Sequence, residues 1–282
     1  MNPGRRNTME DAHTAVAALG GDANTSFFAV YDGHGGRGIV DFLETRLEEN
    51  LALELAAKDD AGVCKRIERA FLTTDVESKQ ENLITSGATA VICLLRLERG
   101  GNGSTEGSLM LYAANVGDSR AVLYQRGAAA RLTRDHKADD PAEVERVEAS
   151  GGFVLRGRVL GILAVARSFG DHGMKEWVPA LPFTSATSLA PPAAVENCVV
   201  ARSGGGGGGG GSGGGDFFIL ACDGIWDVLS DEEACAIVAR AAAEAGEGGG
   251  EGDARNAPAQ ALVAEALRRG STDNITVMVV FL

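Results

Sequence analysis

Apolar residues recur along the chain at two spacings, and these spacings predict which segments are helices and which are strands. Apolar positions repeated every fourth residue are typical of an amphipathic helix, and here they are Ile39, Leu43, Leu47, Leu51 and Leu55. A second helix is predicted directly after it, within 59–82. Short apolar runs bounded by turn residues predict strands, at 12–17, 26–31, 88–96, 109–116, 121–125, 217–222 and 274–282.

Capping residues predict where three further helices begin. Asp140 precedes Pro141, and an acidic N-cap followed by proline is a favoured helix start. Ser230 stands three residues before Glu233, which is the spacing of a capping box. Asn256 is expected to open the last helix.

The order of these elements predicts the fold class. Helices come in pairs and strands in runs, whereas a parallel sheet requires strands and helices to alternate. The segment 109–125 is predicted to form a hairpin that turns at Gly117, Asp118 and Ser119. The pattern therefore favours an α+β domain with antiparallel sheets.

Glycine-rich segments interrupt this pattern without dividing the chain. The longest is a low-complexity segment at 203–215, and shorter ones lie at 100–107 and 246–253. Such segments cannot bury a core and behave as flexible coils. The residues after 215 predict only two helices and two strands, too little for an independent domain. We therefore expect one domain over 1–282, with 203–215 as an expanded surface loop.

Charge and composition exclude several classes of partner. The chain has 39 Asp and Glu against 26 Lys and Arg, a formal net charge of −13, which argues against nucleic acids and anionic membranes. No apolar run approaches the roughly 18 residues of a membrane span, and the start has no apolar leader. The five cysteines lack CxxC spacing, so we expect reduced, mostly buried thiols. These features predict a soluble, intracellular monomer, with nothing to distinguish cytoplasm from nucleus.

Acidic residues gather at the ends of predicted strands, at Glu10, Asp11, Asp32, Asp118, Asp223 and Asp273. Strand ends of one sheet can meet at one edge, where carboxylates repel one another unless cations neutralise them. Oxygen ligands without a cluster of histidines or cysteines suit Mg²⁺ or Mn²⁺ rather than zinc. Taken singly, each acid also fits ordinary turn chemistry.

Eight segments that surround these acids resemble, in the same order, the metal-dependent type 2C protein serine/threonine phosphatases. They run through nearly the whole chain: 6–13 (RNTMEDAH), 31–36 (YDGHGG), 86–90 (SGATA), 115–120 (NVGDSR), 132–137 (LTRDHK), 163–171 (LAVARSFGD), 220–227 (LACDGIWD) and 270–277 (GSTDNITV). The resemblance implies a fold of two antiparallel sheets packed face to face and flanked by helix pairs, an α-β-β-α sandwich.

The resemblance also implies two Mg²⁺ or Mn²⁺ ions and assigns their ligands. Asp32 would bridge both ions, and the Gly33 carbonyl would bind one of them. Asp223 and Asp273 would bind the other ion, while Glu10 would hold metal-bound water.

Further acids are assigned to supporting roles by the same resemblance. Asp11 would support the metal ligands from outside their coordination shell. Asp118, with Asp223 and Asp227, resembles the family's weaker third-metal site.

Two basic residues complete the site that the resemblance implies. Arg6 would bind the substrate phosphate, and His34 would protonate the leaving serine or threonine oxygen. Arg6 lies four residues before Glu10, which would place both side chains on one face of an extended strand. Alternatively, Arg6 is a solvated charge and His34 an ordinary turn residue.

Three functional hypotheses follow. The resemblance favours a phosphatase that hydrolyses phosphoserine and phosphothreonine in phosphoproteins by attack of a metal-bridging water. The first alternative is an inactive phosphatase-like binding domain, although every acid of the two-metal site is present. The second is a dinucleotide-binding oxidoreductase, because 33–38 matches GxGxxG. A dinucleotide-binding motif requires a strand after the helix that follows the glycines. Residues 59–82 instead predict another helix, which argues against this alternative.

Overall fold

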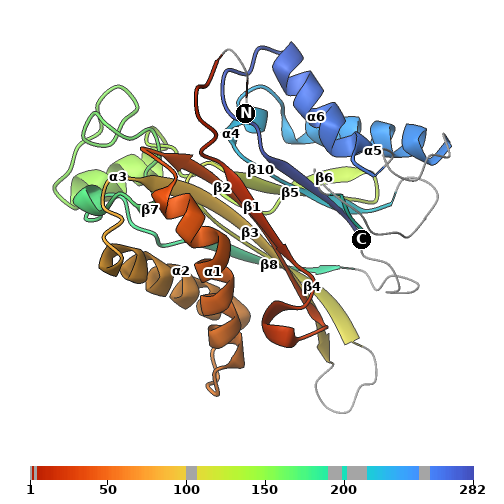
Figure 1. The fold of residues 1–282 in the computed structure, drawn as a ribbon, viewed down its shortest axis with the longest axis horizontal. Helices are drawn as coiled ribbons and strands as arrows, with labels where there is room; N and C mark the ends of the chain where they lie inside the picture. The colour runs from red at the N-terminus through yellow and green to blue at the C-terminus, as the bar shows by residue number, and fades with distance from the viewer. Residues whose placement is uncertain (1, 3–4, 100–106, 190–198, 202–214, 248–254) are drawn as a thin grey trace. The chain divides into compact units, whose positions relative to one another are not determined.

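The computed structural model describes residues 2, 5–99, 107–189, 199–201, 215–247 and 255–282 (Figure 1). The chain divides into two compact units. The larger unit comprises Glu10–Ser119 and Thr133–Ala190, and the smaller unit comprises Met1–Met9, Arg120–Leu132 and Pro191–Leu282. Each unit contains one antiparallel sheet and its own pair of long helices.

The sheet of the larger unit has the order β1-β2-β3-β4-β8, and a short strand, β7, also pairs with β3. Its strands are β1 (Ala12–Val16), β2 (Thr25–His34), β3 (Gly87–Arg99), β4 (Gly107–Val116), β7 (Phe169–Gly170) and β8 (Phe183–Leu189). The register sets Asp32 on β2 opposite Thr89 on β3. The sheet thereby carries the predicted site residues of β2 beside the first residues of β3.

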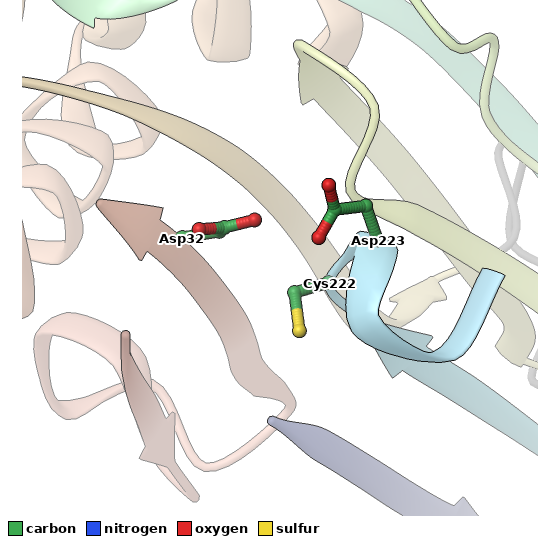
Figure 2. Close-up of side chains that lie close together, drawn as sticks. All are labelled: Asp32, Cys222 and Asp223. Carbon is green, nitrogen blue, oxygen red and sulfur yellow. The ribbon is translucent and has the colours of Figure 1, made fainter. Parts of the chain in front are cut away.

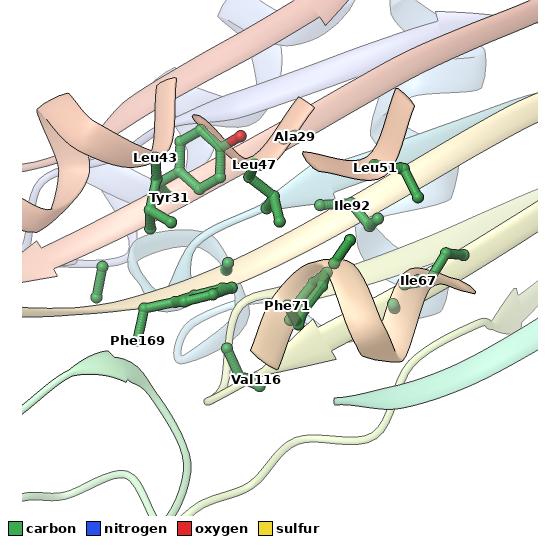
Figure 3. Packing of buried hydrophobic residues seen from close by; sticks show 14 of the residues in the cluster. Ala29, Tyr31, Leu43, Leu47, Leu51, Ile67, Phe71, Ile92, Val116 and Phe169 are labelled. Atoms are coloured by element: carbon green, nitrogen blue, oxygen red, sulfur yellow. The ribbon is translucent and has the colours of Figure 1, made fainter. Parts of the chain in front are cut away.

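A helix pair covers one face of this sheet (Figure 3). The two helices are α1 (Gly38–Ala56) and α2 (Val63–Gln80). Leu43 and Leu47 of α1 and Phe71 of α2 are fully buried in the same core cluster as Tyr31 and Ile92 of the sheet. Burying each such side chain contributes about 1.5–3 kcal/mol, so the periodic leucines fix α1 on the strand that carries Asp32.

Shorter helices complete the larger unit. They are η1 (Leu19–Gly21), α3 (Pro141–Ala149) and η2 (His172–Met174). The Asp140 side chain caps α3 by accepting hydrogen bonds from the backbone N–H groups of Ala142 and Glu143, at 2.9 and 3.3 Å. The helix start predicted at Asp140 and Pro141 is therefore confirmed.

The sheet of the smaller unit has the order β6-β5-β10-β11-β9. Its strands are β5 (Arg120–Gln125), β6 (Ala128–Arg131), β9 (Val199–Ala201), β10 (Phe217–Ala221) and β11 (Val277–Phe281). A short helix, α4 (Asp223–Trp226), follows β10 and precedes the long pair α5 (Asp231–Glu247) and α6 (Ala257–Arg268).

The smaller unit has a core of its own. Ile219 and Val279 of the sheet are buried with Val238 of α5 and Leu262 of α6. The predicted capping box at the start of α5 is confirmed, because the Ser230 N–H donates to Glu233 Oε2 at 2.9 Å and the Glu233 N–H donates to Ser230 Oγ at 3.2 Å.

The hairpin predicted over 109–125 is wrong. Strand β4 pairs with β3 and β8, while β5 pairs with β6 and β10. Both edges of β4 are already occupied, so β5 cannot pair with it, and the turn at 117–119 leads from one sheet to the other. Gly117 makes this turn with φ of 83°, a conformation that suits glycine.

The fold class is confirmed as α+β with two antiparallel sheets and helix pairs. The helix predicted after α1 is α2, so this part of the chain lacks the βαβ unit of a dinucleotide-binding fold. Most of the three glycine-rich segments lies outside the described residues. Cys64, Cys93, Cys222 and Cys235 are free thiols, and all but Cys64 are buried. Across the described ranges, every helix is too short or too polar to cross a membrane.

Candidate functional site

In the larger unit, three candidate residues lie in sequence near the end of β2. Asp32, Gly33 and His34 belong to the strand itself, so the prediction that Asp32 follows the strand is wrong by a few residues. Figure 2 shows the Asp32 carboxylate on β2. A Cβ atom on Gly33 would lie 2.6 Å from the Glu10 carbonyl oxygen, and only glycine permits this approach. Glu10 therefore lies beside Gly33.

The loop after β2 contacts the acidic pair that precedes β1. The Gly36 N–H donates to Glu10 Oε2 at 3.4 Å, and Arg37 Nη1 donates to the Asp11 carbonyl oxygen at 3.0 Å. Asp11 is 4% exposed. Gly36 has φ of 111°, which other residues rarely adopt. The predicted Glu10–Asp11 site and the predicted Asp32–Gly33 site are thus one local structure.

His34 contacts the carboxylate of Asp171, for which the sequence predicts no role. Its Nε2 lies 2.8 Å from Asp171 Oδ2 and 3.0 Å from Asp171 Oδ1, and Ser168 Oγ also donates to Asp171 Oδ2. Burial raises the pKa of Asp171, but the hydrogen bond and charge of His34, with Ser168 and Lys175, lower that pKa below its ordinary value overall. Asp171 therefore holds the imidazole of His34 by one ring nitrogen.

A glycine on the neighbouring strand makes room for this contact. An ideal Cβ on Gly87 would lie 2.1 Å from Asp171 Oδ2 and 2.5 Å from His34 Nε2. The motif 86–90 contained Gly87, yet its spacing alone gave no reason for a glycine there. The need for glycine at this position follows only from the pairing of β3 with both β2 and β7.

Asp118 occupies the turn after β4, where the prediction placed it. It is 6% exposed, and Lys137 Nζ lies 3.9 Å from its Oδ2. Asn115 Nδ2 donates to the carbonyl oxygens of Gly117 at 3.1 Å and Arg134 at 2.7 Å. The Asn115 amide thereby fixes the turn that carries Asp118.

In the smaller unit, two of the predicted acids lie at the two ends of α4, Asp223 within it and Asp227 directly after it. Asp223 is its first residue, directly after the buried Cys222 (Figure 2). The Asp227 N–H donates to the Asp223 carbonyl oxygen at 2.8 Å, so the two acids lie one helical turn apart. A Cβ on Gly224 would lie 2.2 Å from the Asn274 carbonyl oxygen. The segment at 273–274 therefore packs against the start of α4.

Arg6 and Asp273, predicted to bind phosphate and metal respectively, form an ion pair with each other. Their side chains are 49% and 29% exposed. The Asn274 N–H donates to Asp273 Oδ1 at 2.7 Å, and Asn274 Nδ2 donates to the Thr8 carbonyl oxygen at 2.9 Å. Asn274, which had no predicted role, thus ties the N-terminal segment to Asp273.

The expected extended strand from Arg6 to Glu10 is not formed. The N–H groups of Arg5 and Arg6 both donate to the Asn2 carbonyl oxygen, at 3.2 and 3.1 Å. These bonds make a turn, and the first strand begins only at Ala12. Alternation along a strand therefore cannot relate Arg6 to Glu10.

Comparisons with known proteins identify a family that matches most of the sequence. The family model described as Protein phosphatase 2C matches residues 1–195 and 212–275. Protein phosphatase 2C homolog 1 of Saccharomyces cerevisiae is 36% identical over 283 residues, covering 98% of this chain and 89% of the yeast protein. Protein phosphatase 2C homolog 1 of Schizosaccharomyces pombe is 35% identical over 276 residues, covering 98% and 69%.

Solved structures share the fold. A phosphatase from a pathogenic strain of Toxoplasma gondii matches with a TM-score of 0.75 and 22% identity, over 99% of this chain and 90% of that one. A sex-determining protein of C. elegans matches with a TM-score of 0.75 and 24% identity, over 99% and 62%. The family match spans most of the sequence and both units, and the chain therefore belongs to the protein phosphatase 2C family.

Proposed function

We propose that this protein is a Mg²⁺- or Mn²⁺-dependent phosphatase that hydrolyses phosphoserine and phosphothreonine in phosphoproteins. One observation carries the proposal: the family match covers residues 1–195 and 212–275, and every acid that the resemblance assigns to metal binding stands within it. The proposed partners are phosphoprotein substrates, and the net charge of −13 disfavours nucleic acid. We also propose that the protein is a monomer.

The donor set fits a pair of hard cations. The proposed donors are Asp32, the Gly33 carbonyl, Asp223 and Asp273. All four donors are oxygens, which Mg²⁺ and Mn²⁺ prefer. When bound, such ions would supply Lewis-acid activation of water and would stabilise the negative charge on the phosphoryl group. Glu10 would hold water on the metals.

The remaining acids would support a weaker third ion and the ligand shell. Asp118, Asp223 and Asp227 are proposed for the third ion. Asp11 would support the first pair from outside its coordination shell, consistent with its burial and its backbone contact with Arg37.

Arg6 would bind the substrate phosphate through its guanidinium group. A guanidinium can form two parallel hydrogen bonds with a phosphate, and it would offset the repulsion between a phosphate dianion and the acids. Arg6 and Asp273 now neutralise each other. The proposed roles require this pair to open, so that Asp273 can bind metal and Arg6 phosphate. The Arg6 side chain is half exposed, and exposed ion pairs contribute only about 0–1 kcal/mol to stability. Opening this pair therefore costs little free energy.

His34 would act as general acid toward the leaving oxygen. Its Nε2 contacts Asp171, and across the described residues Nδ1 makes no hydrogen bond. We assign proton donation to Nδ1 because it is the ring nitrogen that remains available. An imidazole suits this role since its ordinary pKa lies near neutrality.

Hydrolysis of p-nitrophenyl phosphate in Mn²⁺, in Mg²⁺ and in excess chelator tests the proposed activity. We expect turnover with either metal and its loss in chelator, with recovery when metal is added back. Turnover that persists in chelator would contradict the metal-dependent chemistry. A folded protein without turnover under every condition would instead support the inactive binding domain.

A further inference from the structure

A partly buried ion pair contacts the segment that ends at Asp171, the residue that holds His34. Asp75, on α2, is 6% exposed, and its Oδ1 accepts hydrogen bonds from Lys175 Nζ at 3.0 Å and from the Gly170 N–H at 2.9 Å. Lys175 Nζ also donates to the Ser168 carbonyl oxygen at 3.0 Å. The pair therefore contacts the backbone at two points of the segment 168–171, which ends at Asp171.

This segment needs such support because its backbone is unusual. Gly170 has φ of 68° and Asp171 has φ of 45°. Glycine adopts the left-handed region readily, whereas aspartate does so at a cost. A strained residue persists only when its surroundings fix it in place. Asp171 carries the carboxylate that holds His34, so a relaxed backbone there would move the imidazole.

Other contacts fasten this part of the chain to α2 and to Ser86, which directly precedes β3. Phe169 packs against Phe71 of α2, with ring centroids 5.0 Å apart. The Asp171 N–H donates to the Ser86 carbonyl oxygen at 3.1 Å. His172 Nε2 lies 3.0 Å from Ser78 Oγ, one turn along α2 from Asp75. The Asp75–Lys175 pair adds charged groups to these contacts.

We propose that the Asp75–Lys175 ion pair is a positioning device that fixes Asp171, and through it His34, for proton donation to the leaving oxygen. The inference rests on the proposed phosphatase function. Burying the Asp75 carboxylate costs desolvation, so the pair adds little net stability over apolar residues of the same volume. Its directional bonds to Gly170 and Ser168 instead define one backbone conformation, and this is the property that an oriented acid requires.

The test compares two substrates that differ in their need for a proton. A phosphoserine peptide releases an alkoxide, which must be protonated, whereas p-nitrophenyl phosphate releases a stable phenolate. For Asp75→Asn and Lys175→Met, we expect kcat on the peptide to fall about tenfold, a part of the 10²–10⁴-fold that general acids contribute. KM and kcat on the aryl phosphate should change less than twofold. Lys175→Arg should restore part of the peptide activity.

Control variants separate the possible failures. Asp231→Asn removes a buried carboxylate that pairs with Arg120 and Arg131, so it matches the loss of a buried charge without touching Asp171. It should leave the ratio of peptide turnover to aryl phosphate turnover unchanged.

Equal losses on both substrates in Asp75→Asn and Lys175→Met would overturn the positioning role, as would unchanged peptide turnover. If His34→Gln itself leaves peptide turnover unchanged, the failure belongs to the proposed function. Should Asp75→Asn fail to fold, Lys175→Met decides the question.

Discussion

At the scale of single residues, Gly87 is the position where one added methyl group should impair catalysis most directly. A Cβ atom added at Gly87 would lie 2.1 Å from Asp171 Oδ2 and 2.5 Å from His34 Nε2. Gly87→Ala must therefore displace the carboxylate or the imidazole. We expect kcat on a phosphoserine peptide to fall at least tenfold, with a loss of about 1–3 kcal/mol in the free energy of unfolding from overpacking. Steady-state kinetics and urea denaturation measure the two effects.

Gly62 supplies the matched control for Gly87. It precedes α2 with φ of −67°, and a Cβ there would meet nothing within 4 Å. Gly62→Ala should therefore leave kcat unchanged. Full peptide turnover by Gly87→Ala would show that the contact between His34 and Asp171 does not matter for catalysis.

The sequence motifs contained the candidate residues but not their mutual contacts. His34 and the acids could be selected because their segments match a family pattern. The partner of His34, Asp171, is 137 positions away, and only the pairing of β3 with β2 and β7 brings the two together. Likewise, the ion pair between Arg6 and Asp273 spans 267 positions, a separation over which local patterns carry no information.

At the scale of secondary-structure elements, Asp231 joins a helix to two strands. It begins α5 and accepts hydrogen bonds from Arg120 of β5 and Arg131 of β6, each at 2.7 Å. Burial raises the pKa of Asp231, but the two guanidinium groups lower that pKa overall. Asp231→Asn removes a buried negative charge that two guanidinium groups contact, so we expect about 3–5 kcal/mol less stability at neutral pH.

The pH dependence of this loss follows from the lowered pKa. The charged carboxylate stabilises the fold fully above the unfolded-state pKa of about 4. As pH falls through the lower folded-state pKa, the contribution disappears. The difference in free energy of unfolding between parent and Asp231→Asn should therefore shrink in acid, as denaturant titrations at neutral pH and near pH 3 would reveal. A difference that grows on acidification would contradict the assignment.

Helix starts were predictable because their signals are local, whereas strand partners were not. The caps at Asp140 and Ser230 act within three residues of themselves. Strand β8 has mostly polar residues and only partial burial, as an edge strand allows, so no apolar run marked it. The sequence 109–125 fits a hairpin, and only the occupancy of both edges of β4 rules it out.

At the scale of the whole molecule, the chain forms two units that each bury their own core. Asp32 belongs to the larger unit, and Asp223 to the smaller. The family resemblance could assign both residues to one metal pair because the motifs occur in order along the chain. Hydrophobic periodicity and capping signals could not assign the two residues to one metal pair, because they describe each helix or strand separately. Loss of either ligand should therefore abolish the same activity.

The central claim is that Asp32 and Asp223 bind metal for one phosphatase reaction. Its most direct test measures phosphate release from a phosphoserine peptide over a Mn²⁺ titration, for the parent, Asp32→Ala and Asp223→Ala. The account predicts that the parent saturates with Mn²⁺ and that each variant, although folded by circular dichroism, loses at least about 10³-fold in kcat, because the metal pair cannot replace either ligand. Either variant keeping a substantial fraction of parental turnover at saturating Mn²⁺ would contradict it.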